Sequence, residues 1–250
     1  MKNKLKNLKG QINDIGNFVG FKRIGIVIFL TFLSVIPNVY STSSPNIWNS
    51  LFELGINHVY IIFLIAIISY NVIYMAEATK NSNFLIRYAG YKNYLKDQIK
   101  KILIIIFLVF IFSLFFEILL HIIFHGWDFN FLDIKIYEMP IIVYLLFYYL
   151  RFYLFLFLII ILIYFLYQIG GRILTYIILL LFIFSFNLDI YTKTVNSLFE
   201  IPLLLTNYFQ FVNYSNFFLE ITASFLQFYI LIGIMFLLKY ILMNKKENIL

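Results

Sequence analysis

Residues 102–124 read ILIIIFLVFIFSLFFEILLHIIF. The ionisable side chains in this stretch are Glu117 and His121, and every other position except Ser113 is apolar. A helix of about 20 predominantly apolar residues is long enough to span the hydrocarbon core of a bilayer. We therefore expect this stretch to cross a membrane as one helix, with Glu117 inside it.

The rest of the chain has the same character. Of its 250 residues, 63% are hydrophobic and 12% are charged, and the mean hydropathy is +0.92. Soluble domains usually carry about 25% charged residues, so this much apolar surface requires lipid as its solvent. The composition predicts an all-α integral membrane protein. Its apolar runs predict one transmembrane domain over residues 24–250, with about six spans at residues 24–40, 58–76, 102–124, 140–167, 173–188 and 221–242.

Two segments outside the predicted spans have patterns of their own. Residues 1–23 carry apolar side chains at helical spacing beside lysines, which predicts an amphipathic helix lying on the inner leaflet, although a basic tail also fits. These apolar side chains are Leu5, Leu8, Ile12, Ile15 and Val19. Residues 189–220 mix apolar stretches with asparagines. They predict a segment that is partly embedded in the outer leaflet before the last span.

The basic residues predict the orientation, because cytoplasmic loops of membrane proteins carry an excess of lysine and arginine. Of the 19 lysines and arginines, Lys135 and Lys193 fall on one side of the predicted spans and Arg151 falls within them, whereas all the others fall on the side of the two termini. We expect both termini in the cytoplasm. The net charge of +7 then reflects lysines beside anionic lipid, and no nucleic-acid partner is expected. The abundance of Ile, Phe, Tyr, Asn and Lys is typical of AT-rich genomes and favours a bacterial plasma membrane.

Sequence motifs for catalysis are absent. The chain contains no cysteine, no G-x-x-x-x-G-K-[ST] phosphate loop, no H-E-x-x-H and no G-x-S-x-G. We therefore expect no ATPase site, no metal and no cofactor within this chain.

Glu117, His121 and His125 follow one another at intervals of four residues on the third predicted span. That spacing places the three side chains on one helical face. Glu117 and His125 are separated by about 12 Å along the axis, so one straight helix cannot close all three around a single ion. A polar stripe facing the protein interior is the favoured interpretation, and a metal site is the alternative.

Charges inside a membrane are costly and usually face a partner or a cavity. Glu117 and Arg151 lie at similar depths on consecutive predicted spans, which predicts either a buried ion pair or two residues that line a transport pathway. Tyr144, Tyr148 and Phe155 share the helical face of Arg151. Aromatic rings around a cation could hold an amphipathic ligand. With 21% aromatic residues in the chain, ordinary packing explains such a stripe equally well.

Residues 77–101, between the second and third predicted spans, are too patterned for a linker. The segment begins with Glu77, continues with Phe84-Leu85-Ile86-Arg87-Tyr88, and enters the third span through Tyr91-Lys92-Asn93-Tyr94-Leu95. In this loose motif and in the order of its parts, the chain resembles the membrane subunits of type-2 ABC exporters. The resemblance covers nearly the whole chain in architecture.

The resemblance implies that this loop is a cytoplasmic coupling helix that docks into a groove on a separate ATP-binding cassette ATPase. The residues expected to make that contact are Glu77, Phe84, Leu85, Arg87, Tyr88, Tyr91 and Lys92. It also implies a second permease, either a copy of this chain or a similar one, and ATP and Mg bound by the partner ATPase. Small subunits of this family often export bacteriocins and other amphipathic peptides, or confer immunity to them.

The leading prediction is therefore a permease subunit that moves an amphipathic or hydrophobic substrate, with a peptide as the first choice, out of the cell. A non-transporting immunity or scaffold protein is the main alternative. An intramembrane enzyme that uses Glu117 and the histidines, and a channel or secondary carrier, also stay open. The patterned loop favours the permease, because a scaffold has no need of such a helix.

Overall fold

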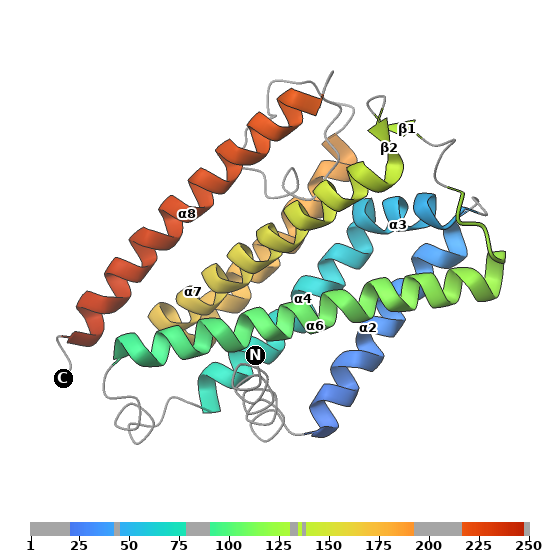
Figure 1. The fold of residues 1–250 in the computed structure, drawn as a ribbon. Helices are drawn as coiled ribbons and strands as arrows, with labels where there is room; N and C mark the ends of the chain where they lie inside the picture. Colours follow the sequence, from blue (N-terminus) through green and yellow to red (C-terminus); the bar gives the residue numbers. More distant parts are fainter. Residues whose placement is uncertain are drawn as a thin grey trace, which may run out of the picture.

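The computed structural model describes residues 21–42, 46–78, 91–130, 135–136, 139–192 and 217–247. Within them the chain forms helices and one two-stranded antiparallel hairpin. Figure 1 shows the helices as a tilted bundle, with α8 along one side. The elements are α2 (Phe21–Ser41), α3 (Ile47–Ile56), α4 (His58–Ala78), α6 (Tyr91–His125), β1 (Lys135–Ile136), β2 (Met139–Pro140), α7 (Ile141–Thr192) and α8 (Phe217–Glu247).

Four of these helices, α4, α6, α7 and α8, contain stretches long and apolar enough to cross a membrane. Helix α2 carries a shorter apolar stretch, Gly25–Ser41. The prediction of an all-α protein with several membrane spans is confirmed. The predicted total of six spans includes α2 and treats each half of α7 as a separate span. This total stays a prediction.

Helix α7 is interrupted at Gly171, within the stretch 168–172 that the sequence predicts as a turn between two spans. Gly171 has φ 74° and ψ −166°, a conformation that side chains with a Cβ rarely adopt. Figure 1 shows the chain reversing direction at this point, so that the second half of α7 runs back toward the end from which the first half came. The glycine therefore turns one long apolar run into two helices.

Helix α3 lies between the first two predicted spans, 24–40 and 58–76, where no helix is expected from the sequence. Ile47, Leu51 and Leu54 recur at helical spacing and are buried. Asn46 caps the helix, since its side-chain oxygen accepts a hydrogen bond from the Trp48 backbone N–H at 3.0 Å. The short helix lies across one end of the bundle, where α2 ends and α4 begins (Figure 1). This is the end at which α6 terminates, and it is named the His125 end below.

At the opposite end, α6 begins at Tyr91, well before the predicted start of the span at residue 102. Tyr91, Tyr94 and Leu95 are buried, and Lys92 is exposed. The amphipathic pattern that the sequence places there is therefore part of one helix of 35 residues. This end, which also holds the break at Gly171, is named the Tyr91 end.

The core of the bundle is formed by α2, α4, α6 and the first half of α7. Helix α8 packs mainly against α7 and leaves a broad apolar surface uncovered. The exposed side chains on α8 include Phe218, Phe225, Tyr229, Phe236, Leu237 and Tyr240. Such a surface needs lipid or another protein around it.

Three predicted segments fall largely outside the described residues. These are the amphipathic segment 1–23, apart from the first residues of α2, the coupling helix around residues 82–90, and the central part of 189–220. The described flanks show that α7 continues to Thr192 and that α8 begins at Phe217, slightly before the predicted span.

The break at Gly171 predicts a specific sensitivity. Gly171→Ala should destabilise the protein by about 1–3 kcal/mol, because alanine is strained at this φ and ψ. Gly233→Ala is the matched control: it lies within α8, and a Cβ there meets nothing within 4 Å. We expect a lower thermal unfolding midpoint in detergent for Gly171→Ala alone. Equal midpoints for the two variants would contradict the break.

Candidate functional site

The polar residues of the His125 end converge on the carboxyl group of Glu117, which is fully buried. Its Oε1 accepts a hydrogen bond from Asn38 Nδ2 of α2 at 2.8 Å and another from the hydroxyl of Ser50 of α3. Asn57, between α3 and α4, donates from Nδ2 to Asn38 Oδ1 at 3.2 Å. We name Glu117, Asn38, Ser50 and Asn57 the Glu117 cluster.

Each member of the Glu117 cluster is positioned by local structure. Asn38 follows Pro37, which cannot donate a helical hydrogen bond and so weakens the last turns of α2. The Asn38 side chain also donates to the backbone oxygen of Ser50 at 3.3 Å. The side-chain oxygen of Asn57 accepts from the Tyr60 N–H at 3.2 Å, in the first turn of α4. One carboxyl group thus joins α2, α3 and α6 and, through Asn57, α4.

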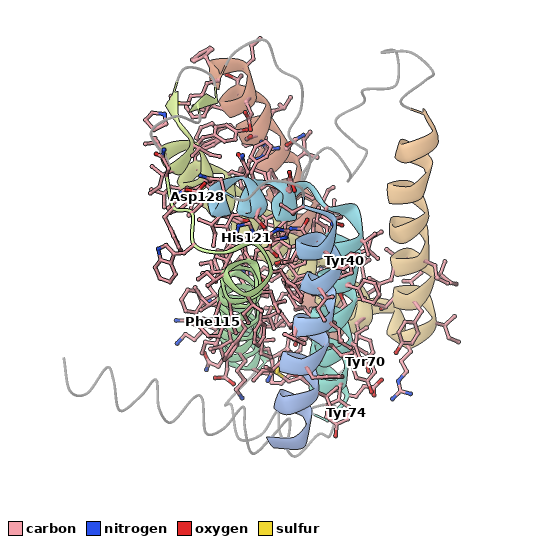
Figure 2. All side chains as sticks on the ribbon, turned by 90° about the vertical axis from the view of Figure 1, so that its right-hand side faces the viewer. Tyr40, Tyr70, Tyr74, Phe115, His121 and Asp128 are labelled. Atoms are coloured by element: carbon pink, nitrogen blue, oxygen red, sulfur yellow. The ribbon has the colours of Figure 1, made fainter. Side chains whose placement is uncertain are left out.

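The polar stripe on α6 extends in both directions from Glu117. One turn earlier, Ser113 accepts a hydrogen bond from the hydroxyl of the buried Tyr60 at 2.6 Å. One turn later, His121 is fully buried, and its ring centroid lies 5.0 Å from that of His125. His125 Nε2 is 2.9 Å from the Val39 carbonyl oxygen. Figure 2 shows His121 inside the bundle, close to α3. The stripe faces the interior, in agreement with the favoured interpretation.

Arg151 belongs to a second buried cluster, between α7 and α8. Its Nη1 lies 2.8 Å from Glu220 Oε1, and both side chains are almost completely buried. The hydroxyl of Tyr144 lies 2.9 Å from each oxygen of Glu220, to which it donates. We name Arg151, Glu220 and Tyr144 the Arg151 cluster. It joins the first turn of α8 to the third turn of α7.

The predicted pairing of Glu117 with Arg151 is therefore wrong. Arg151 pairs with Glu220, and Glu117 is bound by the neutral side chains of Asn38 and Ser50. Similar depth on consecutive spans does not determine which faces meet, and α8 brings Glu220 to Arg151 from far along the chain. From the sequence, Glu220 falls at the end of the segment 189–220 that is expected to be partly embedded in the outer leaflet. The sequence did contain a signal that Glu220 belongs to the first turn of α8, because a glutamate is electrostatically favoured at the N-terminus of a helix.

The aromatic stripe of α7 is filled by packing. Tyr148 is buried, with its ring centroid 6.1 Å from that of Phe152. The Phe155 ring stacks on Phe228 of α8, with centroids 4.0 Å apart and an interplanar angle of 6°. The Arg151 guanidinium carbon lies 5.7 Å from the Phe155 centroid. Ordinary packing, within α7 and between α7 and α8, accounts for these contacts.

The Tyr91 end contains the described part of the predicted coupling segment. Glu77, near the end of α4, forms an ion pair with Arg172, which directly follows the break in α7. Tyr91 is buried and stacks with Tyr94 at 5.8 Å between centroids, and Lys92 is exposed. Phe84, Leu85, Arg87 and Tyr88 lie outside the described residues.

An apolar groove separates α4 from the second half of α7. It has a volume of ≈ 350 Å³, and Figure 2 shows Tyr70 on the side of α4 that faces this part of α7. On α7 the groove begins at Tyr176, five residues after the break at Gly171. Its lining residues are Ile62, Ile65, Ala66, Tyr70, Tyr176, Leu179 and Leu180. A groove of this composition suits an acyl chain or an apolar side chain.

Double-mutant cycles on the free energy of unfolding should show coupling within the Arg151 cluster and additivity between the two clusters. Arg151→Gln and Glu220→Gln should each cost about 3–5 kcal/mol, because each leaves a buried charge without its partner. Combining them should cost less than the sum of the two, by about 0.5–3 kcal/mol. Combining Arg151→Gln with Glu117→Gln should be additive within about 0.5 kcal/mol. A larger coupling of Arg151 to Glu117 than to Glu220 would contradict the assignment.

Comparisons with known proteins add no family to this geometry. No family model, curated protein or solved structure matches the chain at a significant level. The features from which a function can be inferred are therefore the two clusters, the groove, the Glu77–Arg172 ion pair and the order of the helices.

Proposed function

We propose that this chain is the membrane permease subunit of an ATP-driven exporter in a bacterial plasma membrane. Its substrate is amphipathic or hydrophobic, with a peptide as the first choice. ATP and Mg are bound by a separate ATP-binding cassette ATPase. The observation that carries the proposal is the ion pair between Glu77 and Arg172, which ties the start of the predicted coupling loop to the break in α7.

The loop of residues 79–90 is attached to α7 at both of its ends. At its start, Glu77 of α4 holds Arg172. At its finish, Tyr94 of α6 lies beside Tyr164, two turns before the break. A force on the loop therefore reaches α7 on both sides of Gly171. Because the break is the one place in α7 where the helix is interrupted, it is a natural hinge for such a motion.

In this proposal the apolar groove is the substrate site whose width the motion changes. Its two walls are α4 and the second half of α7, the same two elements that the Glu77–Arg172 pair connects. A change in the angle at the break would widen or close the groove. The apolar side of an amphipathic peptide fits such a surface, while its polar side stays near the headgroups.

A second permease completes the proposed assembly. The uncovered apolar face of α8 is the surface we assign to it, either as a second copy of this chain or as a similar chain. The main alternative is a non-transporting immunity or scaffold protein. A scaffold requires neither a loop linked to a helix break nor a groove that opens beside it.

The proposal is tested by co-expressing this chain with the ATP-binding cassette ATPases of the same genome, one at a time. Phe84→Ala with Arg87→Ala should leave insertion normal and abolish co-purification, because aromatic and arginine anchors dominate interfaces. Arg172→Gln should preserve co-purification and lower substrate-stimulated ATP hydrolysis, because the loop no longer holds the break. Lys100→Ala, on the exposed face of α6, is the matched control and should change neither.

The result of the double substitution decides between an exporter permease and a non-transporting immunity or scaffold protein. If partner binding and transport are unchanged in the double variant, this segment is not the coupling helix, and the exporter proposal is contradicted. Loss of co-purification in Lys100→Ala as well would show that the assay reports general damage to this end of the protein.

A further inference from the structure

Glu117 presents an unusual electrostatic arrangement. It is a carboxyl group with no exposed surface, and none of the described lysine, arginine or histidine side chains forms an ion pair with it. Its two hydrogen-bond donors, Asn38 and Ser50, are neutral and both act on Oε1. Its other oxygen, Oε2, is buried and has no hydrogen-bond partner among the described residues.

The two oxygens of Glu117 differ in their hydrogen bonds in the way expected of a neutral carboxylic acid. The carbonyl oxygen of a neutral acid accepts hydrogen bonds, as Oε1 does, and the other oxygen carries the proton. A bare carboxylate at this depth has no counter-charge and would cost several kcal/mol or more. A metal ion would need further oxygen ligands, but Asn38 and Ser50 turn donor groups toward Oε1.

The described groups that face Glu117 from the neighbouring helices are neutral or acidic. Helix α3 contributes Glu53, α4 contributes Tyr60, and α7 contributes Tyr149, each near enough to act on Glu117 electrostatically. On α2 the facing side chain is Asn38, which does not titrate. Among the described side chains around Glu117, those that can carry a positive charge are the two histidines of α6, His121 and His125. A proton is therefore the cation that this site is built to take.

His121 and His125 extend from Glu117 toward the surface. They follow it at one and two helical turns on the same face of α6, and their rings lie 5.0 Å apart. His121 is buried, whereas His125 is partly exposed at the last residue of the helix. An imidazole can accept a proton at one nitrogen and donate it from the other. The three side chains thus lie in a row from the interior to the His125 end, which the charge distribution predicts to be the outer side.

We propose that Glu117 is a proton-binding site and that His121 and His125 connect it with water at the His125 end. The bound proton keeps the carboxyl neutral and its two donors in place. Loss of the proton puts a charge among Asn38 and Ser50 and alters the contact that joins α2 and α3 to α6. The site makes the protein sensitive to the pH on that side, whether or not an ATPase drives it.

The test is infrared difference spectroscopy of the purified full chain in lipid nanodiscs, titrated with acid and base. We expect a C=O band of a protonated carboxylic acid at neutral pH that disappears in Glu117→Gln. Glu53→Gln is the matched control, since it removes a nearby glutamate and should leave the band unchanged. Absence of the band at neutral pH, or its persistence in Glu117→Gln, would overturn the site.

The route is tested through the shift of the same band on transfer to heavy water. His125→Gln should keep the band but slow its deuterium exchange by about 100-fold, because the relay group is gone. An unchanged exchange rate would overturn the route. Should Glu117→Gln fail to fold, carbon-13 labelling of glutamate in His125→Gln keeps the test decisive, because the labelled band must be present and its exchange slow.

Discussion

Hydrocarbon offers no hydrogen-bond partners, so every polar side chain placed in the membrane must find its partners within the protein. This constraint organises the structure. Glu117 takes its partners from α2 and α3. Arg151 of α7 pairs with Glu220 of α8, and Glu220 also accepts a hydrogen bond from Tyr144 of α7. The apolar surfaces of these helices would tolerate many relative rotations in lipid. The two polar clusters tolerate few, because turning a helix away would leave a buried donor, acceptor or charge unsatisfied.

The constraint also explains what the sequence can predict. The length of apolar runs predicts α4, α6 and α8, and the gap between the predicted spans 140–167 and 173–188 corresponds to the reversal in α7. Burial of Glu117 and Arg151 follows from the same reasoning, since charges within a span face inward. Their partners do not follow. Choosing Glu220 for Arg151 requires knowing that α8 packs along α7, a contact between residues 69 positions apart. Helix α3 was missed because its apolar face becomes recognisable only against the helices it covers.

The two ends of the bundle have different physical characters. At the His125 end, the hydrogen bonds of the Glu117 cluster are buried and lock α2, α3, α4 and α6 together. At the Tyr91 end, the Glu77–Arg172 pair lies beside the break in α7, and its arginine is exposed to solvent. Exposed ion pairs contribute little stability. A movement that starts at the Tyr91 end can therefore change the angle of α7 and the groove beside α4 while the His125 end stays assembled.

The central claim is that Glu117 is held by neutral side chains and that Arg151 lies elsewhere. It is tested most directly by solid-state NMR in lipid bilayers, which measures dipolar couplings from the carbon-13 carboxyl of Glu117 to nitrogen-15 side chains, with Glu117→Gln identifying the signal. The account predicts a strong coupling to the amide nitrogen of Asn38, whose distance to Oε1 is 2.8 Å, and none to the guanidinium of Arg151. A strong coupling to Arg151, with none to Asn38, would contradict it.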